Sequence, residues 1–113
     1  CARAASAKSR SDMAHARQVA EIDGLLHEPA RLRILSLLAM VDRADFMYIL
    51  RTTGLSRGNL SVQLGKLEEG GIIGLERELV GARPRTTYFL TEPGRGRLRE
   101  YQRVIHSLVD CFG

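Results

Sequence analysis

Residues with amide and guanidinium side chains lie near one another in the sequence between positions 56 and 66. Asn59 and Gln63 are four residues apart, and Arg57 shortly precedes them. An Asn or Gln amide can bond bidentately to adenine, and an Arg guanidinium can do the same to guanine. Hydroxyl and ammonium groups nearby can hold phosphates. The residues of this stretch that we expect to contact DNA are Ser56, Arg57, Asn59, Leu60, Ser61, Gln63 and Lys66.

A second group of candidate DNA contacts lies between residues 83 and 87. Arg83 and Arg85 flank Pro84, which stiffens the chain and keeps both guanidinium groups directed outward. Thr86 and Thr87 add hydroxyl groups that can reach a phosphate. Of the 17 basic residues only two are lysines, and the formal net charge is +4. This balance favours a polyanionic partner, because Arg suits phosphate and guanine.

The element that must carry the first group is a helix over residues 57–69. Ser56 is a good N-cap for it, and two glycines at 70 and 71 end it. Three leucines at helical spacing would face a core: Leu60, Leu64 and Leu67. A shorter helix starts at Phe46 and stops at Gly54, so only a turn separates the two helices. The pattern therefore predicts a helix-turn-helix.

Apolar periodicity, capping residues and turn residues predict the remaining elements. These are a helix over 12–26, a helix over 29–40, a polar connector over 42–45, strands over 72–80 and 85–91 with a turn at 81–84, and a last helix from residue 92. Residues 1–11 are expected to be a flexible N-terminal segment, and residues 12–113 a single domain. The predicted fold class is mainly α with a small β-hairpin, and the hairpin would be the wing of a winged helix-turn-helix.

The helices at the two ends carry more apolar residues than a small core with one hairpin can cover. Such faces usually bury against a partner, so we expect a homodimer formed through the N- and C-terminal helices. A small-molecule effector could bind where these helices meet the core, in a pocket lined by Leu26, Met40, Tyr101 or Ile105. The sequence identifies no ligand for it.

Several function classes lack their motifs in this chain. It contains no G-x-S-x-G element, P-loop or dinucleotide fingerprint, so we expect neither an enzyme nor a cofactor. Cys1, Cys111 and the three histidines do not have the spacing of metal ligands, so no metal site is expected. No apolar run reaches the roughly 18 to 20 residues of a membrane span, and residues 1–10 do not resemble a secretory signal. We therefore expect a cytoplasmic protein without membrane contact.

Three segments carry a resemblance to a known family. They are HEPARLRIL at 27–35, LSRGNLSVQLGKLEEGGII at 55–73 and GARPRTTYFLTEPGRGRL at 81–98. Residues 25–99 resemble the winged helix-turn-helix regulators of bacteria and archaea, in the superfamily that includes the MarR and ArsR types. The resemblance implies a recognition helix over 56–66, a wing over 83–87, and a homodimer that regulates transcription from pseudo-palindromic sites on double-stranded DNA.

Two alternatives use the same surface. A winged helix could instead be a protein-interaction module that binds an acidic protein partner. Asn59 and Gln63 favour DNA, because side chains that read base edges have little use against a carboxylate surface. RNA binding or non-specific chromatin binding would need stacking aromatic side chains on the exposed face, whereas Tyr48, Tyr88 and Phe89 are expected in the core.

Overall fold

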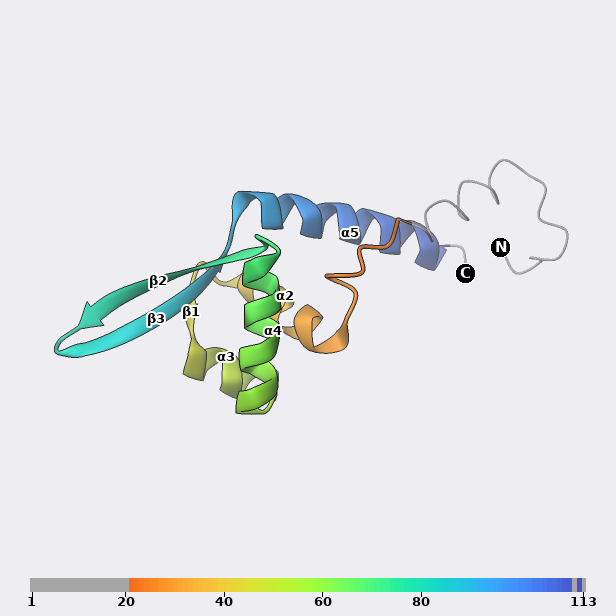
Figure 1. Cartoon of the computed structure of the whole chain (residues 1–113). Coiled ribbons are helices and arrows are strands. Elements are labelled where there is room, and N and C mark those ends of the chain that lie inside the picture. The colour runs from red at the N-terminus through yellow and green to blue at the C-terminus, as the bar shows by residue number, and fades with distance from the viewer. Residues whose placement is uncertain (1–20, 111, 113) are drawn as a thin grey trace, which may run out of the picture.

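The computed structural model describes residues 21–110 and 112. Its elements, labelled as in Figure 1, are α2 (Pro29–Met40), β1 (Ala44–Asp45), α3 (Phe46–Thr53), α4 (Arg57–Glu69), β2 (Ile73–Val80), β3 (Arg83–Leu90) and α5 (Glu92–Asp110). Figure 1 shows the β2–β3 hairpin reaching away from the helices, with α5 running across one end of α4. The fold is mainly helical with a small antiparallel sheet, which confirms the predicted class.

Helix α2 begins where the sequence predicts because two capping features coincide. The carboxylate of Glu28 accepts hydrogen bonds from the amides of Ala30 and Arg31 at 2.9 and 3.1 Å. Pro29 then occupies the first turn, where its missing N–H would have no partner in the helix. The buried residues of α2 are Ala30, Ile34, Leu35, Leu37 and Leu38. Since α3 and α4 both pack on α2, it forms the centre of the core.

The turn between α3 and α4 is defined by its first and last residues. Gly54 ends α3 in the left-handed conformation, at φ 74°, which glycine adopts readily. Ser56 begins α4, and its hydroxyl accepts a hydrogen bond from the amide of Asn59 at 3.1 Å. Both ends are local signals, which explains why the sequence predicts this pair of helices correctly.

The sheet has the order β1-β3-β2, and its neighbouring strands are antiparallel. β2 and β3 pair from Ile73 opposite Leu90 to Val80 opposite Arg83. The predicted turn over 81–84 is too long, because Pro84 and Arg83 already pair with β2. Only two residues connect the strands, and Gly81 supplies the positive φ of 66° that a tight hairpin turn favours.

The predicted connector over 42–45 contains the short strand β1, which is a second correction. Ala44 and Asp45 pair with Tyr88 and Thr87 of β3. Two residues are too few to show periodicity in the sequence, and their conformation depends on a strand far along the chain. The pairing ties the start of α3 to the base of the wing.

Residues 21–28 form turns rather than the end of the helix predicted over 12–26. Asp23 Oδ1 accepts hydrogen bonds from the amides of Leu25 and Leu26, at 3.1 and 3.4 Å. An Asp followed by Gly24 stabilises a turn in this way, and here the local signal overrides the apolar periodicity. The rest of the predicted helix lies outside the described residues.

Helix α5 starts in close contact with the segment between α4 and β2. Thr91 caps it, since its hydroxyl accepts from the amide of Gly94 at 3.0 Å. A Cβ on Gly94 would overlap the carbonyl of Ile72, so only glycine permits this approach. Among the described helices, none is long and apolar enough to cross a membrane.

Candidate nucleic-acid interface

Helix α4 has a buried side and an exposed side. Leu60 and Leu67 are fully buried and Leu64 is 3% exposed, which confirms the predicted leucine stripe. The exposed residues predicted to contact DNA are Ser56, Arg57, Asn59, Ser61 and Lys66. The N-terminus of α4 is exposed as well, and the helix dipole there favours phosphate. The core thus fixes α4 while one side remains accessible.

Two residues of the predicted DNA-contacting set are covered by other parts of the protein. Leu60 belongs to the core, so its side chain cannot reach a ligand. Thr87 is 8% exposed, and its hydroxyl has no hydrogen-bond partner among the described residues. Side chains alternate along a strand, so Thr87 points inward while Thr86 is partly exposed. Both residues are therefore removed from the candidate interface.

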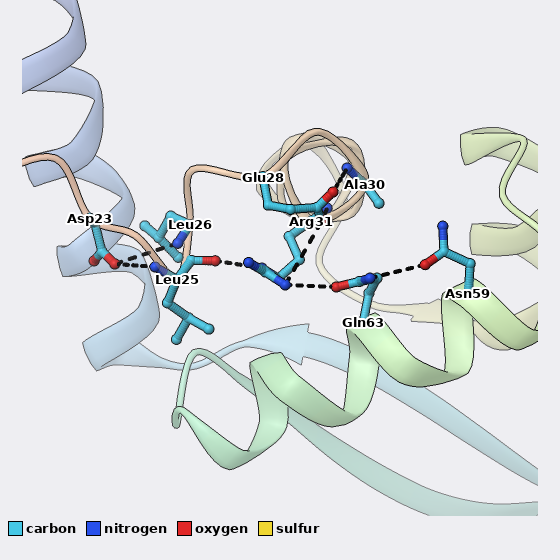
Figure 2. A network of polar contacts seen from close by, with 8 residues as sticks. All are labelled: Asp23, Leu25, Leu26, Glu28, Ala30, Arg31, Asn59 and Gln63. Atoms are coloured by element: carbon cyan, nitrogen blue, oxygen red, sulfur yellow. Dashed lines mark hydrogen bonds and ion pairs between the residues drawn. The ribbon is translucent and has the colours of Figure 1, made fainter.

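Gln63 is half-buried and joins α4 to α2 (Figure 2). Arg31 Nη1 donates to Gln63 Oε1 at 2.8 Å, and Gln63 Nε2 donates to Asn59 Oδ1 at 2.9 Å. The sequence predicts Asn59 and Gln63 as two independent base readers. The structure instead connects them in one line of hydrogen bonds that starts at Arg31, a residue the sequence analysis does not identify.

Arg31 is itself held by groups before and at the start of α2. Its Nε donates to the carbonyl of Leu25 at 2.6 Å, and its Nη1 lies 3.8 Å from Glu28 Oε2. Hydrogen bonds from the amides of Ala30 and Arg31, with the nearby positive charges of Arg31 and Lys66, hold the pKa of Glu28 below its usual 4.5, although burial opposes them. Glu28 therefore stays ionised near neutral pH.

The same network extends to α5 through Asp23. Arg97 donates to both Asp23 oxygens, Nε to Oδ2 and Nη2 to Oδ1, each at 2.9 Å. Asp23 in turn fixes the turn that presents the Leu25 carbonyl to Arg31 (Figure 2). The candidate interface on α4 is thus connected to α5 through polar contacts.

The wing presents its basic residues with less support. Arg83 and Arg85 are exposed, and Arg85 Nε lies 3.8 Å from Asp45 Oδ2. At its base, Arg43 forms an ion pair of 2.7 Å with Glu76 and lies over the ring of Phe89, 4.8 Å from its centroid. The base of the wing is therefore fixed more firmly than its arginines.

The exposed face of α4 contains an apolar residue that the sequence analysis misses. Val62 is 53% exposed, although a valine on a helix usually joins a core. Its position midway between Leu60 and Leu64 places it on the opposite side of the helix, which is the signal available in the sequence. Gly58 lies one turn earlier, and a Cβ there would meet nothing within 4 Å. This surface could approach a base methyl group closely.

The aromatic residues expected in the core behave differently from one another. Tyr48 is 42% exposed on α3, so that expectation is wrong for Tyr48. Tyr88 and Phe89 are half-buried in β3. Burial, together with the negative charge of Glu68, raises the pKa of Tyr88.

Within the described part of one chain, the four residues predicted to line an effector pocket do not share a single groove. Leu26 is fully buried, and Met40 is 81% exposed in a groove between α2 and α3. Tyr101 and Ile105 line a different groove on α5. Leu26 and Tyr101 belong to one core cluster and Ile105 packs against it, whereas Met40 lies apart. The N-terminal helix expected to complete the pocket lies outside the described residues, so an effector site stays a prediction.

The histidines have partners other than metal ligands. His27 Nδ1 lies 2.8 Å from the hydroxyl of Tyr101, and burial raises the pKa of that hydroxyl. His106 Nε2 lies 3.7 Å from Asp110 Oδ2. Within residues 21–110, no group of three His, Cys, Asp or Glu side chains is arranged to hold a metal. His15 lies outside the described residues.

Two helices joined by a short turn, supported by a third helix and followed by a hairpin, define the winged helix-turn-helix class. The comparison with known families agrees. Residues 30–109 match the family described as winged helix DNA-binding domain. Since this is more than half of the chain, the protein belongs to that family.

Individual relatives support the same assignment. An uncharacterised protein of Methanocaldococcus jannaschii is 30% identical over 90 residues, which cover 77% of this chain and 98% of the relative. The structure of a transcriptional regulator homologue from Pyrococcus horikoshii OT3 has a TM-score of 0.79 and 26% identity, covering 85% of this chain and 97% of that one. A homodimeric winged helix-turn-helix DNA-binding domain from Mycobacterium bovis, a possible ArsR-family transcriptional regulator, has a TM-score of 0.60 and 29% identity over 89% of each chain. The predicted likeness to winged helix-turn-helix transcriptional regulators, in the superfamily that includes the ArsR type, is confirmed.

Proposed function

We propose that this protein binds specific sites on double-stranded DNA as a homodimer and thereby regulates transcription in the cytoplasm of a prokaryotic cell. In the proposed complex α4 lies in the major groove, and the wing follows the backbone or enters the adjacent minor groove. The observation that carries the proposal is the polar exposed face of α4, whose opposite face is anchored in the core by Leu60, Leu64 and Leu67.

Base contacts and phosphate contacts have separate sources in this proposal. Arg57 and Asn59 are exposed near the start of α4 and would meet base edges. Gln63 lies beside them and would act through Asn59, to which it donates a hydrogen bond. The residues that would contact phosphates are Ser56, Ser61, Lys66, Arg83, Arg85 and Thr86. Base contacts would supply sequence discrimination, and phosphate contacts would supply salt-dependent affinity.

The dimer is proposed to form through α5, with the N-terminal residues outside the described part. A shallow groove on α5 is lined by Tyr101, Ile105 and Val109, and Val109 is 51% exposed. The related M. bovis domain is homodimeric. Two-fold symmetry would place the two copies of α4 about 34 Å apart, one turn of DNA.

Selection from a pool of randomised DNA duplexes, followed by titration, tests the proposal. We expect the full chain to enrich a pseudo-palindromic site and to bind it about a thousandfold more tightly than a scrambled duplex. The affinity should fall steeply between two salt concentrations. Enrichment of no sequence would contradict site-specific binding. A lack of any salt-dependent DNA binding would favour the alternative, a module that binds an acidic protein.

A further inference from the structure

We infer that Arg31 is a positioning residue that makes Asn59 read guanine rather than adenine. Arg31 lies on α2, and its side chain is 12% exposed, so it acts on DNA only through other residues. The inference rests on the proposed function, because it requires α4 to lie in the major groove. The amide side chains alone would suggest that Asn59 reads adenine, so the inference changes the expected base.

The direction of the hydrogen bonds follows from the chemistry of Arg31. A guanidinium group has N–H donors and no acceptor, so the amide of Gln63 must turn its oxygen toward it. Arg31 Nη1 lies 2.8 Å from Gln63 Oε1. The amide nitrogen of Gln63 then faces Asn59 and donates to Oδ1 at 2.9 Å. Figure 2 shows the nitrogen of Asn59 directed away from this chain of contacts.

This direction determines what Asn59 can offer a base. Guanine presents two acceptors in the major groove, N7 and O6, whereas adenine presents the acceptor N7 and the donor N6–H₂. An Asn that bonds bidentately to adenine needs its oxygen as well as its nitrogen. Gln63 takes one of the two lone pairs of Oδ1 and turns that oxygen toward itself along α4, while the amide nitrogen is directed away. Asn59 therefore presents its N–H donors outward, and these match the acceptors of guanine.

The surrounding contacts keep the Gln63 amide in this orientation. Arg31 is fixed by the Leu25 carbonyl at 2.6 Å, and Asp23 holds that turn while paired with Arg97. Flipping the Gln63 amide would place N–H groups against the N–H groups of Arg31 in a half-buried site. A donor left without an acceptor in such a place is unfavourable, so the network favours one orientation.

The test measures affinity for the selected duplex and for versions with one base pair replaced. Asn59→Ala identifies the position, because discrimination there should disappear. At that position the wild type should prefer guanine over adenine by about tenfold. Arg31→Met should reduce this preference to less than about threefold, since both amides can then turn. Arg33→Met is the matched control, because Arg33 is exposed on the same helix and bonds only the Thr53 carbonyl among the described residues.

Gln63→Glu provides a second variant that keeps Arg31 and its contacts. A carboxylate at this position accepts from Arg31 and from Asn59 Nδ2, so Asn59 would turn its oxygen outward. We expect the preference to reverse toward a base with an exposed donor, adenine or cytosine, and to disappear when Asn59→Ala is added. The added negative charge should weaken binding to all duplexes equally.

The outcomes separate this inference from the proposed function. If the wild type selects a site but Arg31→Met and Gln63→Glu keep the wild-type base preference, the role of Arg31 is refuted while site-specific binding stands. Adenine at the Asn59 position in the wild type would also refute it, as would an Asn59→Ala variant that keeps all its discrimination. If the wild type selects no site, the proposed function fails, and the inference fails with it.

Discussion

Helix α4 and the wing both present basic and polar side chains, but the protein holds them in different ways. Three leucines anchor α4, and a line of hydrogen bonds from Asp23 and Arg31 reaches its exposed face. The outer half of the wing has no such support, and every residue from Glu76 to Arg85 is exposed. The arginines of the wing are held by backbone pairing and by one loose ion pair with Asp45.

This difference indicates which region can determine the specificity for a DNA sequence. A side chain that reads a base edge must be held close to its productive geometry, so it needs a rigid helix and supporting contacts. A side chain that meets a phosphate tolerates more movement, because the attraction of opposite charges depends less on angle. We therefore expect α4 to determine the DNA sequence and the wing to add affinity.

The largest expected effect is on the stability of the protein, which should depend on a buried residue of α4 far more than on a residue of the wing. Leu67→Ala removes a fully buried side chain from α4 and should lower the free energy of unfolding by about 2 to 5 kcal/mol. Leu79→Ala in the wing, where the side chain is 73% exposed, should change it by less than about 0.5 kcal/mol. Urea denaturation measures both. Equal losses would mean that the wing is packed as firmly as the helix.

The second prediction separates the regions by their effects on DNA binding. Arg57→Ala should reduce the discrimination between the selected and scrambled duplexes by about 1 to 3 kcal/mol. Arg83→Ala should instead weaken binding to both duplexes alike and reduce the salt slope by about one. Titrations at several salt concentrations provide both values. If both variants lost the same affinity for the selected and the scrambled duplex, the different roles of helix and wing would be contradicted.

The third prediction concerns the support of α2 beside the α4 network. Glu28→Ala removes an N-cap and should lower stability by about 1 kcal/mol at neutral pH. The pKa of Glu28 is lowered in the folded state, so its stabilising effect is present above the unfolded value, near 4.5, and is lost as the pH falls through the folded value.

Midpoints of urea denaturation at pH 7 and pH 3 test how the stabilising effect of Glu28 changes with pH. The difference between wild type and Glu28→Ala should shrink at the lower pH. The matched control is Glu76→Ala, because Glu76 is 55% exposed at the wing and pairs with Arg43 at the surface. Such a pair contributes little, so this change should stay below about 1 kcal/mol. A Glu28 effect that grows with acidity would be inconsistent with the lowered pKa.

The smallest expected effect tests the apolar part of the α4 face. If Val62 contacts a thymine methyl, replacing that thymine by uracil should cost the wild type about 0.8 kcal/mol of binding free energy. Val62→Ser should bind both duplexes nearly equally. Val80→Ser in the wing, where Val80 is 46% exposed, should keep the wild-type difference. A uracil effect that survives in Val62→Ser would assign the methyl contact to another residue.

The sequence by itself determined the helix-turn-helix and most of the wing. Ser56, Gly54 and the leucine spacing act within a few residues of themselves, because caps and helix faces depend on local hydrogen bonds and periodicity. The wing arginines were also visible, as a cluster next to a turn. For the same reason the exposure of Val62 was available in the pattern, although it was not recognised.

Only the tertiary structure decided how the candidate interface is organised. Arg31 meets Gln63 because α2 packs beside α4, and nothing in the spacing of these two residues indicates it. Strand β1 exists because β3 lies next to it, and Thr87, which pairs with Asp45 of β1, is buried. These features depend on contacts between distant segments, whose geometry is set by packing, whereas local patterns report only the conformation of the segment itself.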